Sequence, residues 1–311
     1  MANVSDQVLF VLVGFPSLQE RYYALVGTIF FLAYVMSLCA NSTVVLLIIF
    51  REHLHQPMYL IILNLAISDI IYDTATLPKI ISKYWSGDGT ISFVGCFIQM
   101  PIVHTLNSLD SLTILLMALD RYVAICMSLR YHSIMTNRVA VILCSIGWLV
   151  GGFVGLYVTS WALPLPFCGP NKVRNIYCSL SKVAFTSCID STIVRTNSFY
   201  TGIVMHMIPL SFIVLSYIVI IATVCLTMSS ENWLKMFNTC VTHWFIITVF
   251  FIPRIVEYGY NQYQLVPNAD VNVLIICLYS YVPHVFNPII FCLRNNEIKK
   301  TLGQIFKQMT I

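Results

Sequence analysis

Residues 117–126 read MALDRYVAIC and place an acid, an arginine and a tyrosine in a row at the end of a long apolar segment. Charged side chains are expensive inside lipid, so Asp120 and Arg121 on a membrane-spanning helix need a partner, a water path or a function. Both lie where the segment ends and can reach an aqueous interface. A charged flank is common on spanning helices, but it explains the charges and not the residues around them. The stretch therefore indicates the polar end of a membrane-spanning helix that has a specific role.

The composition excludes a soluble domain. Of the 311 residues, 58% are hydrophobic and 10% charged, and the mean hydropathy is +0.81, whereas about a quarter of the residues in a soluble domain are charged. A spanning helix needs about 20 mostly apolar residues, and the connections between such stretches are short. We therefore expect an all-α membrane protein, a single seven-transmembrane helix bundle over residues 22–293, with spans at about 22–50, 57–82, 91–126, 139–163, 196–228, 235–260 and 271–293.

Two local features orient the chain, because the balance of basic residues does not. With the N-terminus outside, nine Lys and Arg fall on the cytoplasmic side and eight on the outer side, which is too even for the positive-inside rule. The tail of residues 1–21 shows no cleavable signal-peptide pattern, but Asn3 begins a glycosylation sequon that requires a lumenal N-terminus. Residues 294–311 are basic and amphipathic, which suits a short eighth helix on an anionic inner leaflet.

These features predict a multi-pass protein of the plasma membrane with an extracellular N-terminal tail and a cytoplasmic C-terminus. Membrane lipid is then an expected partner. The net charge of +4 is modest and gives no reason to expect nucleic acid as a partner.

Four of the eleven cysteines fall on the outer side of the bundle: Cys96, Cys168, Cys178 and Cys188. The other seven lie in spans or near their inner ends, where cysteine is usually a small buried hydrophobe. An oxidising outer face favours two disulfides, but four cysteines permit three pairings and the sequence alone does not choose among them. No histidine accompanies these cysteines at metal-ligand spacing, so we expect no zinc site built on them.

Further motifs follow one another along the seven spans. They are LHQPMYL at 54–60, NLAISD at 64–69, LPKI at 77–80, Trp148, Pro209, Ser216-Tyr217, KMFNTCVTH at 235–243 and PHVFNPIIF at 283–291. Together with MALDRYVAIC, this set resembles the olfactory receptors, a branch of the rhodopsin-like G-protein-coupled receptors, over nearly the whole chain. The stretch LPLPFCG at 163–169 looks like the fish-like (class I) branch of that family.

The resemblance implies an odorant receptor and not an enzyme. A small-molecule odorant would bind in the outer half of the bundle, and a stimulatory, olfactory-type heterotrimeric G protein would be activated at the inner end and raise cyclic AMP. The same resemblance pairs Cys96 with Cys178 and Cys168 with Cys188. Two alternatives remain: a non-olfactory rhodopsin-like receptor for a small metabolite, and a small-solute transporter. The transporter is disfavoured because no internal repeat or pair of broken half-helices is evident.

The resemblance also places a ligand pocket between the third, fifth, sixth and seventh spans, under the loop of residues 164–195. The implied lining comprises His104, Asn107, Ser108, Ser111, Thr201, Met205, Phe251, Arg254, Tyr258, Gln262 and Tyr279. The four residues of the third span share one helical face, and a polar stripe on a spanning helix faces the bundle. For Ser108 and Ser111, hydrogen bonding between helices is as good an interpretation as ligand contact.

Arg254 is the most informative of these residues, because it lies in an apolar span and follows the helix-bending Pro253. Glu257, three residues later, could neutralise it as a local pair. If Glu257 points elsewhere, Arg254 offers an anion site for a carboxylate. Both readings stay open at this point.

A second polar set lies at mid-membrane. Asp69 and Asp110 are the acids deep in their spans, and the resemblance places both near Asn287. Two neighbouring carboxylates in a low dielectric cannot both stay ionised without compensation. Either they share a proton, or a cation lies between them, for which sodium with oxygen ligands is the natural candidate. No other cofactor is expected.

The remaining residues concern coupling to the G protein: Asp120, Arg121, Tyr122, Tyr217, Lys235, His243, Asn287, Pro288 and Phe291. Arg121 has five donors and is expected to pair with Asp120 when the bundle is closed, either as a lock that opens toward Tyr217 or as a permanent ion pair. Phe291 stands where the family usually has tyrosine, so it lacks a hydroxyl that would bridge to Tyr217 and Arg121.

Overall fold

The computed structural model describes residues 9–168, 170–227, 230–263, 268–294 and 299, with the backbone alone for residues 227, 230–242, 260–263 and 293–294. Asn3 and nearly all of the expected eighth helix therefore lie outside the described residues, as do the side chains of Lys235 and Gln262. The long helices are α1 (Tyr23–Phe50), α2 (Pro57–Ser86), α3 (Phe93–Cys126), α5 (Asn137–Ser160), α7 (Thr192–Thr227), α8 (Ser230–Tyr263), α9 (Ala269–Ser280) and α10 (Val282–Arg294). Two short helices, α4 (Tyr131–Ile134) and α6 (Leu180–Val183), lie in connecting segments.

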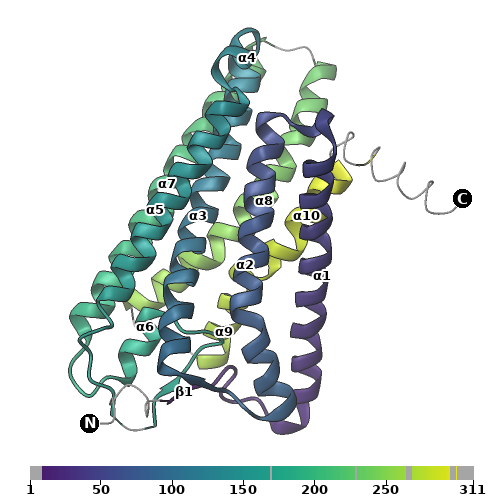
Figure 1. Ribbon diagram of the computed structural model, residues 1–311. Coiled ribbons are helices and arrows are strands. Elements are labelled where there is room, and N and C mark those ends of the chain that lie inside the picture. Colours follow the sequence, from purple (N-terminus) through teal and green to yellow (C-terminus); the bar gives the residue numbers. More distant parts are fainter. Residues whose placement is uncertain (1–8, 169, 228–229, 264–267, 295–298, 300–311) are drawn as a thin grey trace, which may run out of the picture.

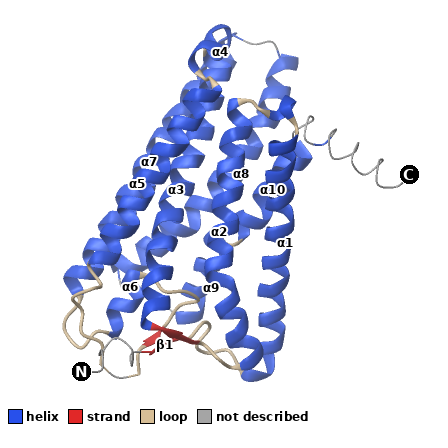
Figure 2. Cartoon of the chain, viewed as in Figure 1, coloured by secondary structure: helices blue, strands red, loops and turns tan. Residues whose placement is uncertain are grey.

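The helices form one elongated bundle (Figures 1 and 2), which confirms the predicted fold class. Six helical segments of the described residues are long and apolar enough to cross a membrane, the last of them running through α9 and α10. The long helix α8 is the remaining member of the bundle. A break at Tyr281 divides the seventh span into α9 and α10, and the prolines expected to bend helices, Pro209, Pro253 and Pro288, lie inside α7, α8 and α10.

Apolar side chains cover the outside of the bundle as well as its core. On α5, Leu149 is 73% exposed and Phe153 is 70% exposed, as expected for a surface that faces lipid tails. The opposite face of α5 carries glycines, and α5 lies beside α3 (Figure 1). A Cβ atom on Gly155 would lie 2.5 Å from the backbone oxygen of Pro101. Small residues let two spanning helices approach this closely.

The end of the bundle opposite α4 is closed by a small sheet and the loop that follows α5. Strand β1 (Leu9–Leu12) pairs antiparallel with β2 (Thr90–Ser92) and parallel with β3 (Lys172–Val173), so the strand order is β2-β1-β3. Phe10 and Leu12 are fully buried there. The described part of the N-terminal tail is therefore packed against this end of the bundle. We call the sheet together with the loop between α5 and α7, residues 161–191, the cap.

Two disulfides hold the cap together. Cys96 at the start of α3 is bonded to Cys178 in the loop, and Cys168 is bonded to Cys188 within the loop, each with a Cα–Cα distance of 5.5 Å. These are the two pairs that the resemblance implies.

Candidate ligand-binding cavity and interior polar sites

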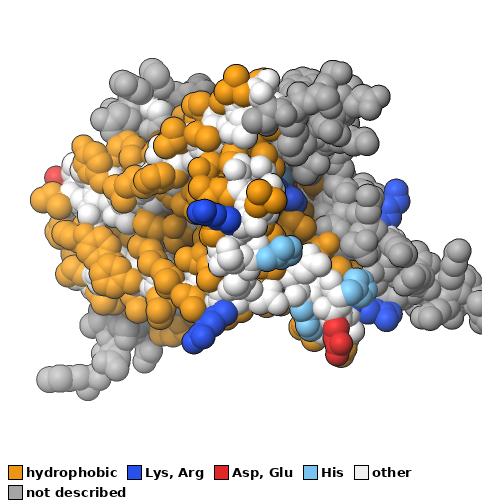
Figure 3. All heavy atoms as spheres, turned by 90° about the horizontal axis from the view of Figure 1, so that it is seen from above, with side chains coloured by type: hydrophobic (Ala, Val, Ile, Leu, Met, Phe, Trp, Pro, Cys, Tyr) orange, Lys and Arg blue, Asp and Glu red, His pale blue; other side chains and the backbone are white. Residues whose placement is uncertain are grey.

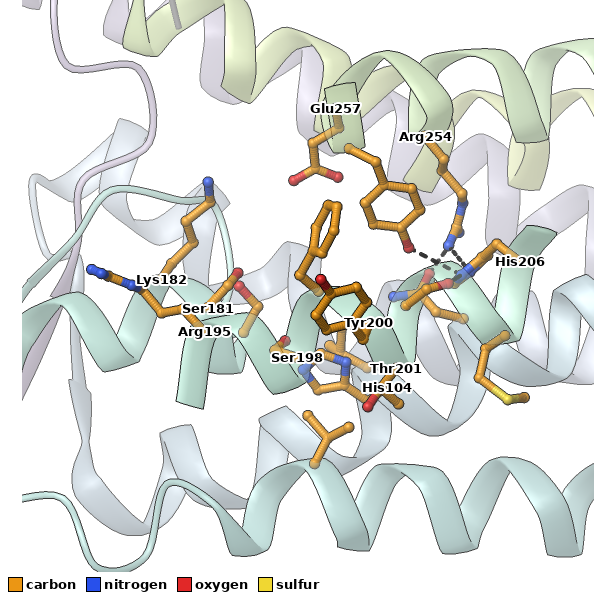
Figure 4. A pocket seen from close by; sticks show the side chains of 18 of the residues that line it. His104, Ser181, Lys182, Arg195, Ser198, Tyr200, Thr201, His206, Arg254 and Glu257 are labelled. Carbon is orange, nitrogen blue, oxygen red and sulfur yellow. Dashed lines mark hydrogen bonds between the residues drawn. The ribbon is translucent and has the colours of Figure 1, made fainter. Parts of the chain in front are cut away.

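A cavity of about 650 Å³ lies beneath the cap, between α3, α7, α8 and α9 (Figure 4). This volume falls in the range of small-molecule sites, about 300–1,000 Å³. Eight of the eleven residues predicted for the pocket line it: His104, Asn107, Ser108, Thr201, Met205, Arg254, Tyr258 and Tyr279. They come from four helices that are far apart in the sequence.

Three predicted residues do not contribute to the described lining. Ser111 is fully buried, and its hydroxyl has no hydrogen-bond partner within the described part of the chain. Phe251 is 1% exposed and packs edge-on against Phe250 in the inner hydrophobic core. The side chain of Gln262 is outside the described residues. Ser108 donates to the backbone oxygen of His104 in its own helix at 2.9 Å, so neither serine bonds another helix among the residues described.

Arg254 is a buried cation of the cavity wall. It is 4% exposed, and its guanidinium lies over the rings of Phe250 and Tyr279, at 4.2 and 4.6 Å from their centroids. One terminal nitrogen donates to Nε2 of His206, and the other donates to Oδ1 of Asn107 at 2.7 Å. Among the residues that the structure describes, its Nε has no hydrogen-bond partner. Within the described residues Arg254 forms no salt bridge, and in Figure 4 its guanidinium points toward His206 and not toward Glu257.

His206 on α7 is a site residue that the sequence reasoning missed. Because arginine can only donate, Nε2 of His206 accepts the bond from Arg254. The proton of the neutral ring is then on Nδ1, which is 2.7 Å from the backbone oxygen of Gly202 and 3.1 Å from the hydroxyl of Tyr258. Tyr258 and Arg254 are thus held through one histidine. A histidine in a charge-free span was itself the signal that marks it as functional.

The cap is attached to the cavity wall by polar contacts from α3. His104 accepts a bond from the backbone nitrogen of Leu180 at 3.3 Å. Gln99 accepts from the backbone nitrogen of Cys178 at 2.8 Å and donates to the backbone oxygen of Ala75 at 2.7 Å. Lys182 of the cap also lines the cavity, on the side away from Arg254 in Figure 4. Of the predicted pocket residues, His104 therefore has a structural role as well.

A polar cluster in the middle of the bundle joins α2, α3 and α10. It consists of Asp69, Asp73, Asp110 and His284, each at most 3% exposed. The imidazole of His284 is central: its Nε2 lies 3.5 Å from Asp69 and 3.8 Å from Asp110, and its Nδ1 lies 2.8 Å from Asp73. The structure thus brings Asp69 and Asp110 together as predicted.

Two members of this cluster differ from the sequence expectation. Asp73 is as deeply buried as Asp69, so Asp69 and Asp110 are not the sole acids deep in their spans. His284 takes the place beside the carboxylates that Asn287 was expected to hold. Asn287 is 4% exposed on α10 and makes no hydrogen bond to Asp69 or Asp110 among the described residues.

The end of α3 that carries Asp120 and Arg121 also differs from the expected arrangement. Asp120 accepts a hydrogen bond from the hydroxyl of Tyr131 at 2.8 Å, and burial together with this bond raises the pKa of Tyr131. Arg121 donates through Nε to His243 of α8 at 3.4 Å, and its Nη2 contacts the sulfur of Met58. No salt bridge joins Asp120 to Arg121 in the described chain, because neighbours on other elements occupy both side chains.

Three more of the residues predicted for coupling, Tyr122, Tyr217 and Phe291, belong to or pack against one hydrophobic core. Tyr217 is 2% exposed, and its ring centroid lies 5.7 Å from that of Trp244. Phe291 is 8% exposed and belongs to the same hydrophobic core as Tyr217, against which Tyr122 also packs. Pro288 lies within α10.

Comparison with known proteins places this arrangement in context. The sequence profile of the family described as "Olfactory receptor" matches residues 30–309. Human Olfactory receptor 6B1 is 34% identical over 306 residues, which cover 98% of this chain and 96% of that protein. Human Olfactory receptor 10A3 is 31% identical, covering 99% and 98%, and mouse Olfactory receptor 6B9 is 32% identical, covering 97% and 95%.

Proposed function

Since the chain belongs to the olfactory receptor family and is an odorant receptor, not an enzyme, we propose that its odorant is a small carboxylic acid held at Arg254. Family membership also sets aside the transporter that the sequence left open. The assignment to the fish-like branch stays a prediction.

The observation that carries the proposal is a buried guanidinium on the cavity wall without a carboxylate beside it. A buried charge without an opposite charge beside it destabilises the folded protein. Because Arg254 has only neutral hydrogen-bond partners among the described residues, an anionic group of the ligand would supply the missing charge. Its Nε–H is unused, and its two terminal nitrogens are held by His206 and Asn107. Hydrogen bonds between a guanidinium and a carboxylate are about twice as strong as neutral ones.

The shape of the cavity supports a ligand with an apolar body. Phe250 and Tyr279 lie against the guanidinium, and Val103, Met205 and Ile276 add apolar side chains elsewhere on the wall. An acid group at Arg254 would leave the hydrocarbon part of the odorant among these residues. Glu257, on the same wall, would repel a carboxylate placed near it and so favours the end of the cavity at Arg254.

We place the G protein at the end of the bundle that carries α4. That end exposes His53, Arg130, His132 and Arg138, and Figure 3 shows basic and histidine side chains gathered over it. Basic residues favour the cytoplasmic side, and the two disulfides favour an oxidising outer side for the cap. The N-terminus is then extracellular, and the stimulatory G protein that raises cyclic AMP would dock beside Asp120, Arg121 and Lys235.

Helix α8 offers a path from the cavity to that end. It carries Arg254 in the cavity wall and, three turns nearer the inner end, His243 in contact with Arg121 of α3. An acid that draws Arg254 toward the cavity would shift α8 near Pro253, and the weak 3.4 Å contact between His243 and Arg121 would separate. Arg121 would then be free to meet the G protein.

The proposal is tested by replacing Arg254 in cells that express an olfactory G protein and report cyclic AMP. Each straight-chain acid is compared with the aldehyde and the alcohol of the same length. Arg254→Ala is expected to raise the half-maximal concentration for acids by about 10- to 100-fold, since a charged hydrogen bond contributes about 1.5–3 kcal/mol. Responses to neutral odorants should change little.

Glu257→Gln is the matched control, because it removes a charge from the same wall without touching the anion site. It should leave acid responses intact or increase them. Equal losses for acids and neutral odorants in Arg254→Ala, or loss of acid responses in Glu257→Gln, would contradict the proposal.

A further inference from the structure

Asp69 is the least satisfied member of the interior cluster. It is 1% exposed, and within the described part of the chain neither of its carboxylate oxygens has a hydrogen-bond partner. The other two acids are supported, since Ser37 donates to Asp73 at 2.5 Å and Ser68 donates to Asp110 at 2.6 Å. A buried carboxylate without donors is costly. Nε2 of His284 lies 3.5 Å from Asp69, but even a protonated His284 would supply only one positive charge to a cluster of three carboxylates.

The tautomer of His284 follows from its neighbours. Asp73 already accepts from Ser37 on one oxygen, and its other oxygen lies 2.8 Å from Nδ1 of His284. A carboxylate can only accept, so Nδ1 carries the proton. In a neutral ring, the lone pair of Nε2 then points toward Asp69 and Asp110. A histidine that donates one ring N–H to a carboxylate and presents the other nitrogen is the usual arrangement of a metal ligand.

The spacing distinguishes a metal from a proton. A protonated Nε2 would donate to one carboxylate at about 2.7–2.9 Å, but the nearest oxygens are 3.5 and 3.8 Å away. Ligand atoms about 2.0–2.2 Å from a tetrahedral zinc ion lie about 3.3–3.6 Å apart. The three ligand atoms of Asp69, Asp110 and His284 all lie within 4.8 Å of one another. The distance of 3.5 Å between His284 and Asp69 falls in that range, and the distance of 3.8 Å between His284 and Asp110 is slightly longer.

We propose that Asp69, Asp110 and His284 bind a divalent transition-metal ion of the zinc type, with Asp73 as the positioning residue that orients His284. Imidazole nitrogen suits zinc and its neighbours in the periodic table, whereas alkali ions take oxygen ligands, so this donor set fits the sodium ion expected from the sequence poorly. A divalent ion neutralises two of the three buried carboxylates, which cannot stay ionised together without a cation.

The ion would join three helices, because Asp69 and Asp73 lie on α2, Asp110 on α3 and His284 on α10. Helix α1 adds a fourth connection, since Asn41 donates to the backbone oxygen of His284 at 2.9 Å. A bound ion would stabilise this arrangement of the helices between the odorant cavity and the inner end. The site is separate from Arg254, so it does not depend on which odorant the receptor takes.

The test is thermal unfolding of the purified full-length receptor, stripped of metal by a chelator and incubated to equilibrium with Zn²⁺, Na⁺ or Mg²⁺. An ion that binds only the folded state raises Tm as its concentration increases. Zn²⁺ is expected to raise Tm by several degrees, and Na⁺ and Mg²⁺ by much less. The shift should vanish in His284→Gln and Asp69→Asn, and it should persist in His132→Gln, which removes an exposed histidine of α4. Arg254→Ala should also keep it, which separates this test from that of the odorant.

Asp73→Asn tests whether Asp73 contributes to the Zn²⁺ affinity through His284. It preserves the shape of the positioning residue but weakens its hold on His284, and loss of such a partner lowers metal affinity about 10- to 100-fold. The Zn²⁺ concentration needed for half of the Tm shift should rise by that factor.

A measurement on the wild-type receptor covers the case in which these variants fail to fold. Cu²⁺ bound at this site should show the electron paramagnetic resonance pattern of a single coordinating imidazole nitrogen with oxygen ligands. A spectrum with several nitrogens or none would overturn the proposal. So would a Zn²⁺ shift that persists in His284→Gln, a larger shift with Na⁺ than with Zn²⁺, or the absence of any shift, which would assign the cluster to an internal ion pair.

Discussion

At the scale of single residues, Arg254 and Arg121 are each hydrogen-bonded to a histidine and form no salt bridge among the described residues. Arg254 donates to His206 between α8 and α7, and Arg121 donates to His243 between α3 and α8. A neutral histidine accepts a hydrogen bond but does not cancel the charge. Each arginine is therefore held in place and yet remains available to an anion or to a new partner.

The inner pair leads to a prediction about basal activity. His243→Ala removes the contact between α8 and Arg121 of α3. The fraction of receptor in which Arg121 is free to meet the G protein should therefore rise without odorant. A bond of this length contributes at most about 1 kcal/mol, which corresponds to about a fivefold change in population. Cyclic AMP measured without odorant, at equal surface expression, should increase accordingly.

Tyr131→Phe is the control for this prediction. It removes a hydrogen bond to Asp120 at the same end of the bundle and leaves in place the contact between Arg121 and His243. Its basal cyclic AMP should stay at the wild-type level. An unchanged or lower basal signal in His243→Ala would show that the contact does not restrain α8.

At the scale of helices, the packing of α5 against α3 depends on which glycine faces inward. Gly155 has the backbone of Pro101 within 2.5 Å of where a Cβ would stand, and Gly151 has the backbone oxygen of Thr105 within 2.8 Å. Around Gly152, on another face of the same helix, no atom of the described residues lies within 4 Å of that position, apart from the helix's own neighbouring backbone and the adjoining residues. A larger side chain should therefore be tolerated at Gly152 but not at Gly155, less than one helical turn away.

Gly155→Val should therefore separate α3 from α5, whereas Gly152→Val should be accepted. Overpacking of this kind costs about 1–3 kcal/mol, and here the obstacle is backbone and cannot rotate away. Surface expression by flow cytometry and Tm of the purified protein should both fall for Gly155→Val alone. The matched change at Gly152 has the same effect on helix propensity, so equal losses in the two variants would refute the packing argument.

At the scale of the whole molecule, the cap closes the end of the bundle above the cavity with a sheet and two disulfides. Strand β1 lies between β2 and β3. One disulfide joins the loop that contains β3 to α3, and the other closes that loop on itself. The cavity lies directly beneath, and Asn175, Tyr177 and Ser179 of the cap form part of its wall. Stability of the cap and ligand binding are therefore linked.

Cys178→Ser should destabilise the receptor and weaken its odorant response at the same time. Loss of a native disulfide costs about 2–5 kcal/mol, and Cys178 is next to Tyr177 and Ser179 in the cavity wall. Cys225→Ser, which changes an exposed free thiol on α7, is the control and should alter neither. A Cys178→Ser receptor with wild-type Tm and response would separate the cap from ligand binding.

Much of this architecture could be read from the chain. Runs of apolar residues determine the number and approximate place of the spans, because each helix satisfies its own backbone in lipid whatever its neighbours are. The motifs identify the family, and eight of the eleven residues that the resemblance places in the pocket line the cavity. Arg254 could also be predicted as a functional residue, because a cation in an apolar span is expensive in lipid and needs a partner.

What only the tertiary structure decided is which polar groups meet. Asp73 and His284 are 211 residues apart, and His206 reaches Arg254 across 48 residues, so no local pattern links them. Whether Arg254 pairs with Glu257 likewise depends on the direction of α8 side chains within the bundle. Sequence determines which segments enter the membrane, since burial in lipid is a property of each segment alone. The partners of a buried charge are set by how the helices pack, and that packing arises from contacts between distant parts of the chain.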